Sequence, residues 1–314
     1  MSTYKLIEEL SLNHELCFRP FVYNDISFLK SNNDFDQKHF YWVEDTHHQV
    51  HGHIAFSVVN GVAFSPHKLP FGGLEVSDQL SIKDVTDFME AIEQNLSQKG
   101  IKELRIHQAP NAYYEWTNST GAFEARGFDI IQNRIFHTIK VDQNDLISQM
   151  HKMEQRKIKM CVRDGAEFKE LKKSRKVEGF KWIDRFRNLA YKPPSMNWVD
   201  LAEASQRNPK VFKVFGVYMD GYLLAATVIV LVNDKAVYHF MPASHVDFQH
   251  YKKYSPMVFL VNELYKWCQS AGVEVLDLGT SYVDMKTKDS LVKFKENIGG
   301  KATEALSWQK TLSS

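Results

Sequence analysis

The residues best suited to acid–base chemistry lie in the last quarter of the chain, on predicted β-strands. Asp277 belongs to the mostly apolar run 273–278, and a charge inside such a strand needs a partner or a chemical role. Tyr238 and His239 are consecutive on another predicted strand, so their side chains lie on opposite faces and only one can line a given cleft. Histidine suits a general base near neutral pH, whereas tyrosine suits proton donation to a leaving group.

Each of these residues also has a purely structural interpretation. At the end of its strand, Asp277 would cap the next turn by accepting hydrogen bonds from backbone N–H groups. Tyr238 would be an ordinary packed tyrosine and His239 a hydrogen-bonded core histidine. The sequence leaves both interpretations open.

A basic segment lies near the middle of the chain. Residues 151–176 contain ten Lys or Arg and four Asp or Glu, in a chain whose formal net charge is +1. Four of the basic residues are spaced so that they share one face of a predicted helix: Lys152, Arg156, Lys159 and Arg163. This local charge suits a phosphate-rich ligand such as a tRNA acceptor end, a CoA 3′-phosphate or a lipid pyrophosphate. A solvated basic surface with no ligand is the alternative.

Histidines cluster near the start of the chain, at His47, His48, His51 and His53. The last two share a strand face and would form a two-ligand metal edge. Only Glu44 and Asp45 are near enough in the sequence to add to them, and no cysteine is close. We therefore predict no metal site.

The overall composition is that of an ordinary globular protein. Of the 314 residues, 44% are hydrophobic and 25% are charged, and the net charge of +1 excludes a global attraction to nucleic acid or membrane. Cys17, Cys161 and Cys268 are scattered and form no CxxC pair, which fits a reducing cytoplasm. No apolar run reaches the roughly 18 residues of a membrane span, and no signal-peptide core is present near Met1. We expect a cytoplasmic protein.

An internal repeat positions these residues. Each half has three short strands, a loop, an amphipathic helix and a further strand. In the first half we predict strands at 41–43, 53–59, 62–64 and 101–106 and a helix at 82–99. In the second half we predict strands at 211–218, 223–232, 236–241 and 273–278 and a helix through 258–268. Gly100 and Gly127 in the first half are matched by Gly272 and Gly299, each 172 residues later.

This duplication predicts two consecutive domains of one α/β (α+β) fold. Each would contain a mixed, mostly antiparallel sheet flanked by helices. We place the first domain at residues 1–144 and the second at residues 145–314, which would open with the basic helix. The region 145–208 is expected to be helical, with Pro193 and Pro194 interrupting it.

The element order of each half is that of the GNAT acyltransferase fold, and the tandem arrangement resembles the FemAB-like acyltransferases, including the Fem-type peptidoglycan aminoacyltransferases. Three stretches carry the resemblance, at 154–166, 276–281 and 290–300. The resemblance implies that Lys295, in a Phe-Lys pair before a glycine turn, lies near a donor or substrate phosphate. It also implies that Ser281 lies with Asp277 around the cleft of the second domain.

The loops where GNAT proteins cradle the CoA pyrophosphate differ from the family pattern in both halves. The first half has Pro70, Phe71, Gly72 and Gly73. The backbone N–H groups of its glycines suit a nest, and we expect Phe71, Gly72 and Gly73 to shape an acceptor groove. The second half has residues 250–256, where Lys252 and Lys253 would meet phosphate with side chains.

The resemblance implies an acyltransferase, bacterial by its family, that moves an acyl or aminoacyl group from an acyl-CoA or aminoacyl-tRNA donor to an amine. The amine would belong to a small molecule, a peptidoglycan precursor or a protein. Two other interpretations remain. One is a non-catalytic GNAT-like protein that binds a phosphorylated ligand or a protein partner. The other is a nucleic-acid-binding protein that uses the basic helix.

Overall fold

The computed structural model describes residues 3–11, 13–32, 36–114, 117–190, 195–246, 251, 253–283 and 286–312. Contacts divide the chain into two compact units, and each unit has its own hydrophobic core. The first unit contains Met1–Arg134 together with Glu304–Ser314, and the second contains Ile135–Thr303. The division into domains at 1–144 and 145–314 remains a prediction.

The first unit is a mostly antiparallel sheet with a single parallel pair, β5 and β7, along its main path. Its strands follow the order β1 (Tyr4–Ile7), β3 (Asp36–Glu44), β4 (Gln49–Val59), β5 (Val62–Ser65), β7 (Glu103–His107) and β16 (Lys301–Thr311). Two short strands pair with β4: β2 (Glu15–Leu16) and β6 (Glu75–Val76). The helices of this unit are η1 (Val22–Asn24), α1 (Ile26–Asn32), α2 (Ile82–Gln98) and α3 (Thr117–Ala125).

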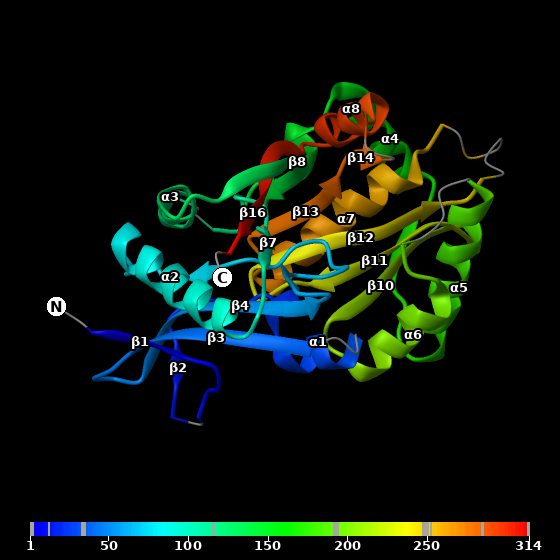
Figure 1. The fold of residues 1–314 in the computed structure, drawn as a ribbon. Coiled ribbons are helices and arrows are strands. Elements are labelled where there is room, and N and C mark those ends of the chain that lie inside the picture. Colours follow the sequence, from blue (N-terminus) through cyan, green and yellow to red (C-terminus); the bar gives the residue numbers. More distant parts are fainter. Residues whose placement is uncertain are drawn as a thin grey trace. The chain divides into compact units, whose positions relative to one another are not determined.

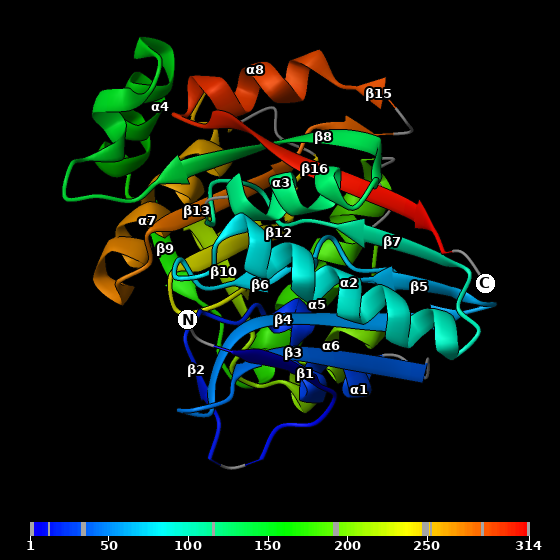
Figure 2. The same ribbon diagram turned by 60° about the vertical axis from the view of Figure 1, so that its left-hand side comes forward.

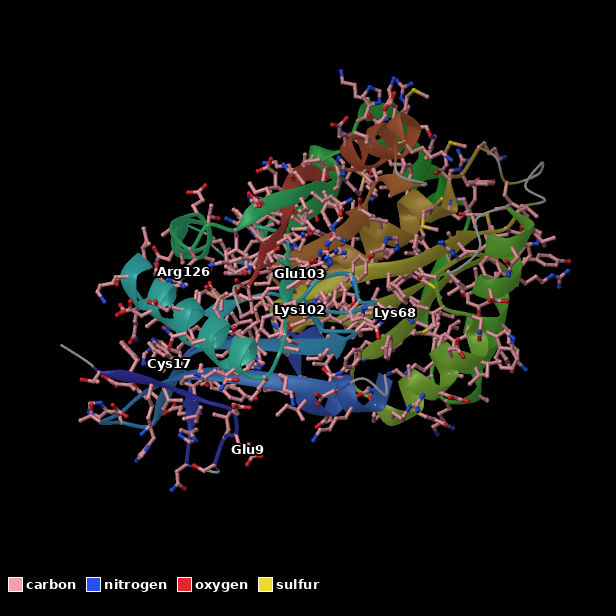
Figure 3. The ribbon with its side chains drawn as sticks, in the orientation of Figure 1. Glu9, Cys17, Lys68, Lys102, Glu103 and Arg126 are labelled. Atoms are coloured by element: carbon pink, nitrogen blue, oxygen red, sulfur yellow. The ribbon has the colours of Figure 1, made fainter. Side chains whose placement is uncertain are left out.

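Helix α2 confirms the predicted helix at 82–99. A capping box starts it, because the Ser81 side chain accepts from the backbone of Asp84 while the Asp84 side chain accepts from that of Ser81. Its apolar stripe is buried in the core of the unit. Helix α3 packs beside it (Figure 2), and Arg126, labelled in Figure 3, pairs with Glu93 of α2 at 2.7 Å.

The last strand of the chain completes the sheet of the first unit. Residues 307–311 of β16 pair antiparallel with residues 103–107 of β7. Trp308 is buried there against the ring of Phe123, with 5.2 Å between ring centroids. No local pattern in the sequence predicted this partner, because the pairing joins segments about 200 residues apart.

The second unit has the same kind of mixed sheet. Its strands follow the order β8 (Asp129–Lys140, in this unit from Ile135), β13 (Val275–Thr280), β12 (Ala236–Ser244), β11 (Tyr222–Leu231), β10 (Phe212–Met219) and β9 (Glu167–Glu170). Its longer helices are α4 (Lys152–Arg163), α5 (Ser174–Leu189), α6 (Trp198–Arg207), α7 (Pro256–Ala271) and α8 (Asp289–Asn297). Three short elements complete it: η2 (Leu146–Gln149), β14 (Tyr282–Val283) and β15 (Lys286–Thr287). The predicted helical region 145–208 therefore also contains a strand, β9, whose four residues lack a clear apolar alternation.

Helices cover both faces of this second sheet (Figure 1). On one face, α4 and α7 enclose the main core together with apolar residues such as Phe215 and Val217 of β10. On the other face, Gly179 of α5 lies directly against Val214, which points away from that core because side chains alternate along a strand. Residues of β12 and β13 can thus be assigned to an α7 face or an α5 face.

Strands β12 and β13 run parallel for only three residue pairs. The last of these joins Tyr238 and Asp277, while β12 continues to Ser244 without β13 as a neighbour. On its other side, β13 has an irregular register with β8 between Asp277 and Thr280. The two parallel strands therefore separate immediately after Tyr238 and Asp277.

Candidate active site

A buried lysine and a buried aspartate meet where the two strands separate. Lys295, on α8, is 5% exposed, and Asp277, on β13, is fully buried. The Lys295 ammonium donates to the carbonyl oxygens of Gly279 at 2.6 Å and Thr280 at 2.8 Å. The Asp277 carboxylate accepts from the backbone N–H of Gly279 at 2.6 Å. Both side chains therefore converge on the short irregular stretch of β13 around Gly279, which we call the Gly279 turn.

Burial and charge act in opposite directions on Lys295. Removal from water lowers the pKa of its ammonium to about 8, and the Asp277 carboxylate limits that fall. Two of the three N–H donors of Lys295 are used by carbonyl groups, which leaves one for a further acceptor. This lysine can hold positive charge in a dry site and can release a proton close to neutral pH.

Gly279 allows this turn to form. It has a φ of +75°, and a Cβ atom there would lie 3.0 Å from Cε2 and 3.3 Å from the hydroxyl oxygen of Tyr238. Tyr238 and Asp277 are paired in register and therefore face the same side of the sheet. The Tyr238 hydroxyl thus lies beside the turn that Asp277 and Lys295 hold. The Asp277 carboxylate accepts from the N–H of Gly279 inside β13, and not at the end of the strand, where the structural interpretation had placed it.

Two histidines lie near the Lys295 charge. Burial lowers the pKa of His239 to about 3, and the Lys295 cation adds to this effect. The same two causes lower the pKa of His137, whose Nδ1 lies 3.5 Å from the hydroxyl of Ser281. In both rings Nε2 is buried and has no hydrogen-bond partner in the described part of the chain. Both imidazoles are therefore neutral at physiological pH.

The structure adds two residues that our sequence analysis did not select. His137 interrupts the mostly apolar run 135–139 of β8, and this polar residue within the run is the sequence feature that could have identified it. Arg187 follows Ile183 by four residues, which places a cation on the buried side of α5. Its guanidinium donates to the carbonyl of Pro242 at 3.1 Å and interacts electrostatically with Tyr238.

The basic residues of α4 are on the surface. Arg156 and Lys159 are exposed, as are Lys152 and Arg163, while Ile158 and Cys161 pack inward. Lys253 is exposed just before α7, with its ammonium 4.8 Å from the ring centroid of Tyr254. Lys252 lies outside the described residues. The predicted common face of the α4 cations is confirmed, whereas their role as a phosphate site remains a prediction.

The glycine loop of the first unit is part of its core. Phe71, Gly72 and Gly73 are buried, and a Cβ on Gly73 would lie 1.9 Å from the Gln108 side-chain oxygen. The backbone N–H of Gly72 donates to the His107 carbonyl at 3.0 Å, and that of Gly73 donates to the Ser65 hydroxyl at 3.2 Å. Both N–H groups are thus already used within the unit. An acceptor groove formed by these residues remains a prediction.

The histidines of the first unit are engaged with polar neighbours. His53 Nδ1 lies 2.8 Å from the Glu75 carboxylate, His51 Nδ1 lies 2.9 Å from the Ser77 hydroxyl, and His47 pairs with Glu44. Among the described residues, no group of three His, Cys, Asp or Glu side chains is arranged to hold a metal ion. In the same ranges, no helix combines the length and apolar character needed to cross a bilayer.

Comparison with known proteins agrees with this architecture. The family profile described as an acetyltransferase (GNAT) domain matches residues 166–287, within the second unit. No curated protein sequence matches the chain. Among solved structures, the crystal structure of FemX aligns with a TM-score of 0.73 at 12% identity, covering 94% of this chain and 93% of that chain.

Two further structures extend the likeness. L-PGS from Bacillus licheniformis aligns with a TM-score of 0.58 at 13% identity, covering 91% of this chain and 86% of that chain. A tandem GNAT protein from the clavulanic acid biosynthesis pathway aligns with a TM-score of 0.50 at 10% identity, covering 92% and 88% of the two chains. The predicted α/β class and the tandem GNAT fold are therefore confirmed.

Proposed function

We propose that this chain, which is a tandem GNAT-fold protein of the FemAB-like type, transfers an acyl or aminoacyl group to an amine. The working site would be the turn at Gly279 in the second unit. The GNAT acetyltransferase profile, which covers residues 166–287 and so includes this turn, supports acyl transfer in general. The donor would be an acyl-CoA or an aminoacyl-tRNA.

One observation carries this proposal. Lys295 and Asp277 are buried together at the point where β12 and β13 stop pairing. A buried charged pair costs several kcal/mol in desolvation, so it is weak evidence for stability and more typical of a site with a chemical task. The Tyr238 hydroxyl beside the same turn adds a proton donor.

The reaction needs three contributions from these residues. An alkyl ammonium with a pKa of about 10.4 first loses one proton to water, at a cost of roughly 4–5 kcal/mol at neutral pH, and becomes the attacking amine. As the amine nitrogen bonds to the donor carbonyl carbon, its proton passes to Asp277. The remaining Lys295 N–H stabilises the developing oxyanion. When the acyl–sulfur or acyl–oxygen bond breaks, Tyr238 protonates the leaving atom and later regains a proton from Asp277.

The other selected residues would support this chemistry. Burial keeps His239 neutral, so it adds no competing charge beside Lys295. Ser281 would bind the donor near Lys295, and Arg156, Lys159, Lys252 and Lys253 would attract its phosphates. Phe71, Gly72 and Gly73 would help to shape the groove for a small-molecule, peptidoglycan-precursor or protein amine. We also propose a cytoplasmic location, because the three scattered cysteines fit a reducing compartment.

A second function is favoured by one specific observation. The backbone N–H groups of Gly72 and Gly73 are used internally, and the glycines of the family's phosphate loop are missing from the second half. A non-catalytic protein that binds a phosphorylated ligand or a protein partner would have this pattern. It would bind a donor without turning it over.

The test combines binding and turnover. The wild-type protein is screened by thermal shift with acetyl-CoA, longer acyl-CoAs and aminoacyl-tRNA, and any donor that binds is incubated with a panel of amines. A ligand at 100 times its dissociation constant stabilises the protein by about 2.7 kcal/mol. We expect one donor class to stabilise the protein and amide product to form. Stabilisation without product would support the binding protein, and no stabilisation by any donor would refute donor binding.

Variants connect the activity to the site. Removing Lys295 alone leaves Asp277 buried without its cation, so the paired variant Asp277→Asn/Lys295→Met removes both charges at once. Lys293→Met, on the exposed side of the same helix, is the matched control. We expect the paired variant to fold and lose turnover while the control keeps it. Turnover by the paired variant would remove this cluster from the mechanism.

A further inference from the structure

Arg187 is an unusual cation within the second unit. It lies near the end of α5 and is half-buried, with Nη1 donating to the carbonyl of Pro242 at 3.1 Å. Its Nε atom is fully buried and has no hydrogen-bond partner within the described segments of the chain. Among the described residues, no carboxylate forms an ion pair with Arg187, whereas the half-buried Lys157, Lys213 and Lys235 of this unit each have one. Burial accordingly lowers the pKa of this guanidinium.

A half-buried guanidinium without an anion lowers the stability of the folded protein. A guanidinium stays charged in a protein, so burial without an anion removes hydration and gives no ion pair in return. An unsatisfied buried N–H adds a further penalty. A cation that is retained in this condition is better explained by a ligand than by the stability of the free protein.

The geometry of the guanidinium defines the ligand. Its contact with Pro242 uses Nη1 and fixes the orientation of the planar group. The opposite edge, formed by Nε and Nη2, makes no hydrogen bond to the described residues. Two parallel N–H groups on that edge match two oxygens of a carboxylate or a phosphate.

Arg187 lies in the neighbourhood of the proposed reaction site. Tyr238, which lies against Gly279, is the group that interacts electrostatically with Arg187. The rings of Trp182 and His245 each pack on Phe186, the residue before Arg187, with 4.4 Å between ring centroids. Pro242 lies on β12 beyond the point where β12 and β13 stop pairing.

We propose that Arg187 binds an anionic oxygen group of the substrate, a carboxylate or a phosphate, through its Nε–Nη2 edge. The inference rests on the proposed function only in placing the ligand beside Tyr238. Anion binding at Arg187 can be measured without turnover.

The experiment compares Arg187→Met and Arg187→Lys with wild type in the full chain. The probes are inorganic phosphate, pyrophosphate and glutarate, titrated at constant ionic strength and followed by calorimetry and thermal shift. We expect saturable binding by wild type and a loss of about 10- to 100-fold in Arg187→Met, since a charge-assisted hydrogen-bonded pair is removed. Arg187→Lys keeps the positive charge but loses the two parallel N–H donors of the guanidinium edge, so it should bind the probes with intermediate affinity. The phosphate and glutarate arms distinguish the two sources of the anion.

Stability in the absence of ligand is the second measurement. Without anion, Arg187→Met should melt at the same temperature as wild type or higher, because it replaces an unpaired half-buried charge by an apolar chain. Arg175→Met, on an exposed position of the same helix, is the control for removal of a surface arginine and should bind the probes as wild type does. A fall in the melting temperature of ligand-free Arg187→Met, or equal probe binding by wild type and Arg187→Met, would overturn the proposal.

The two proposals fail separately. Asp277→Asn/Lys295→Met should lose turnover and still bind the anionic probe that wild type binds. If wild type binds none of the probes, the anion site is refuted while acyl transfer at Gly279 stands. If it binds a probe but no acyl donor yields product, acyl transfer is refuted while the anion site stands.

Discussion

Replacing His39 by glutamine should reduce the acid sensitivity of the folded protein. His39 and His53 lie on adjacent strands of the first unit, with His39 Nδ1 3.3 Å from His53 Nε2. His53 Nδ1 in turn lies 2.8 Å from the Glu75 carboxylate. When both rings are neutral, this chain of bonds leaves the buried Nε2 of His39 as a bare acceptor, which has no partner among the described residues.

The surroundings determine the direction of the effect. Burial lowers the pKa of His39 from 6.5 to about 3, and the charges of His53 and Lys30 contribute to the shift. Tyr41 stacks on His53 with ring centroids 4.5 Å apart, and burial near Glu75 and Asp25 raises its pKa to about 12. Tyr41 therefore stays neutral throughout the acidic range. The titration of interest is that of His39.

The magnitude follows from linkage. Because the pKa is lower in the folded state, the unfolded chain binds more protons between pH 6.5 and about 3, so stability is retained above pH 6.5 and lost as the pH falls. At about 1.4 kcal/mol per pKa unit, the loss attributable to His39 on going from about pH 7.5 to about pH 5 is roughly 2 kcal/mol. That corresponds to about a 30-fold change in the folding equilibrium.

The assay is urea unfolding at the two pH values, with hydrogen exchange of residues 15–32 as a local measurement. This segment covers the histidines, since Phe18 stacks on His53 and the backbone N–H of Phe21 donates to Glu75. Relative to wild type, His39→Gln should lose about 2 kcal/mol less on acidification. His48→Asn, at an exposed turn position with φ of +56° that asparagine tolerates, is the control. Equal acid losses in wild type and His39→Gln would refute this reasoning.

Two further changes probe the second unit. Gly279→Ala should destabilise the protein by about 1–2 kcal/mol, because Gly279 has a φ of +75° and the added Cβ would press on Tyr238. The variant should also have reduced turnover. An unchanged melting temperature and unchanged turnover would show that the turn is not constrained. Arg156→Glu/Lys159→Glu should leave the melting temperature nearly unchanged, because both residues are exposed. It should weaken donor binding and make the dissociation constant depend less steeply on salt, as measured by titration at several salt concentrations. Donor affinity equal to wild type would remove α4 from the donor site.

The parts of the fold that repeat locally could be predicted from the sequence. The apolar spacing and the glycine after the helix predicted α2 nearly to the residue, and the same pattern predicted α7. Short apolar, β-branched runs separated by turn residues such as Asn60-Gly61 and Asp220-Gly221 predicted the strands of both meanders. The strand β9 was wrongly included in a helical region, because four residues with weak alternation carry little periodic signal. The pairing of β16 with β7 depends on contacts that no local pattern contains.

The candidate site was predictable in part for the same reason. Asp277 stood out as a charge in an apolar strand, and Lys295 stood out through the family resemblance, but neither signal showed that they meet at Gly279. That meeting depends on a positive φ and on the irregular pairing after Asp277, which are properties of the folded chain. Arg187 could have been noticed as a basic residue four positions after Ile183. His137 could have been noticed as a polar residue in an apolar strand. Both signals are common in ordinary surfaces and cores.

The position of Lys295 explains why its structural and chemical roles cannot be separated by a single substitution. The Gly279 turn lies within β13, where the pairing with β8 is irregular, and the ammonium of Lys295 binds two of its carbonyl oxygens while balancing the charge of Asp277. Lys295→Met alone should therefore cost about 3–5 kcal/mol, as expected when one partner of a buried pair is removed. Asp277→Asn/Lys295→Met should recover much of that loss and remain inactive. Recovery of stability together with recovery of turnover would show that this pair is structural and that the chemistry lies elsewhere.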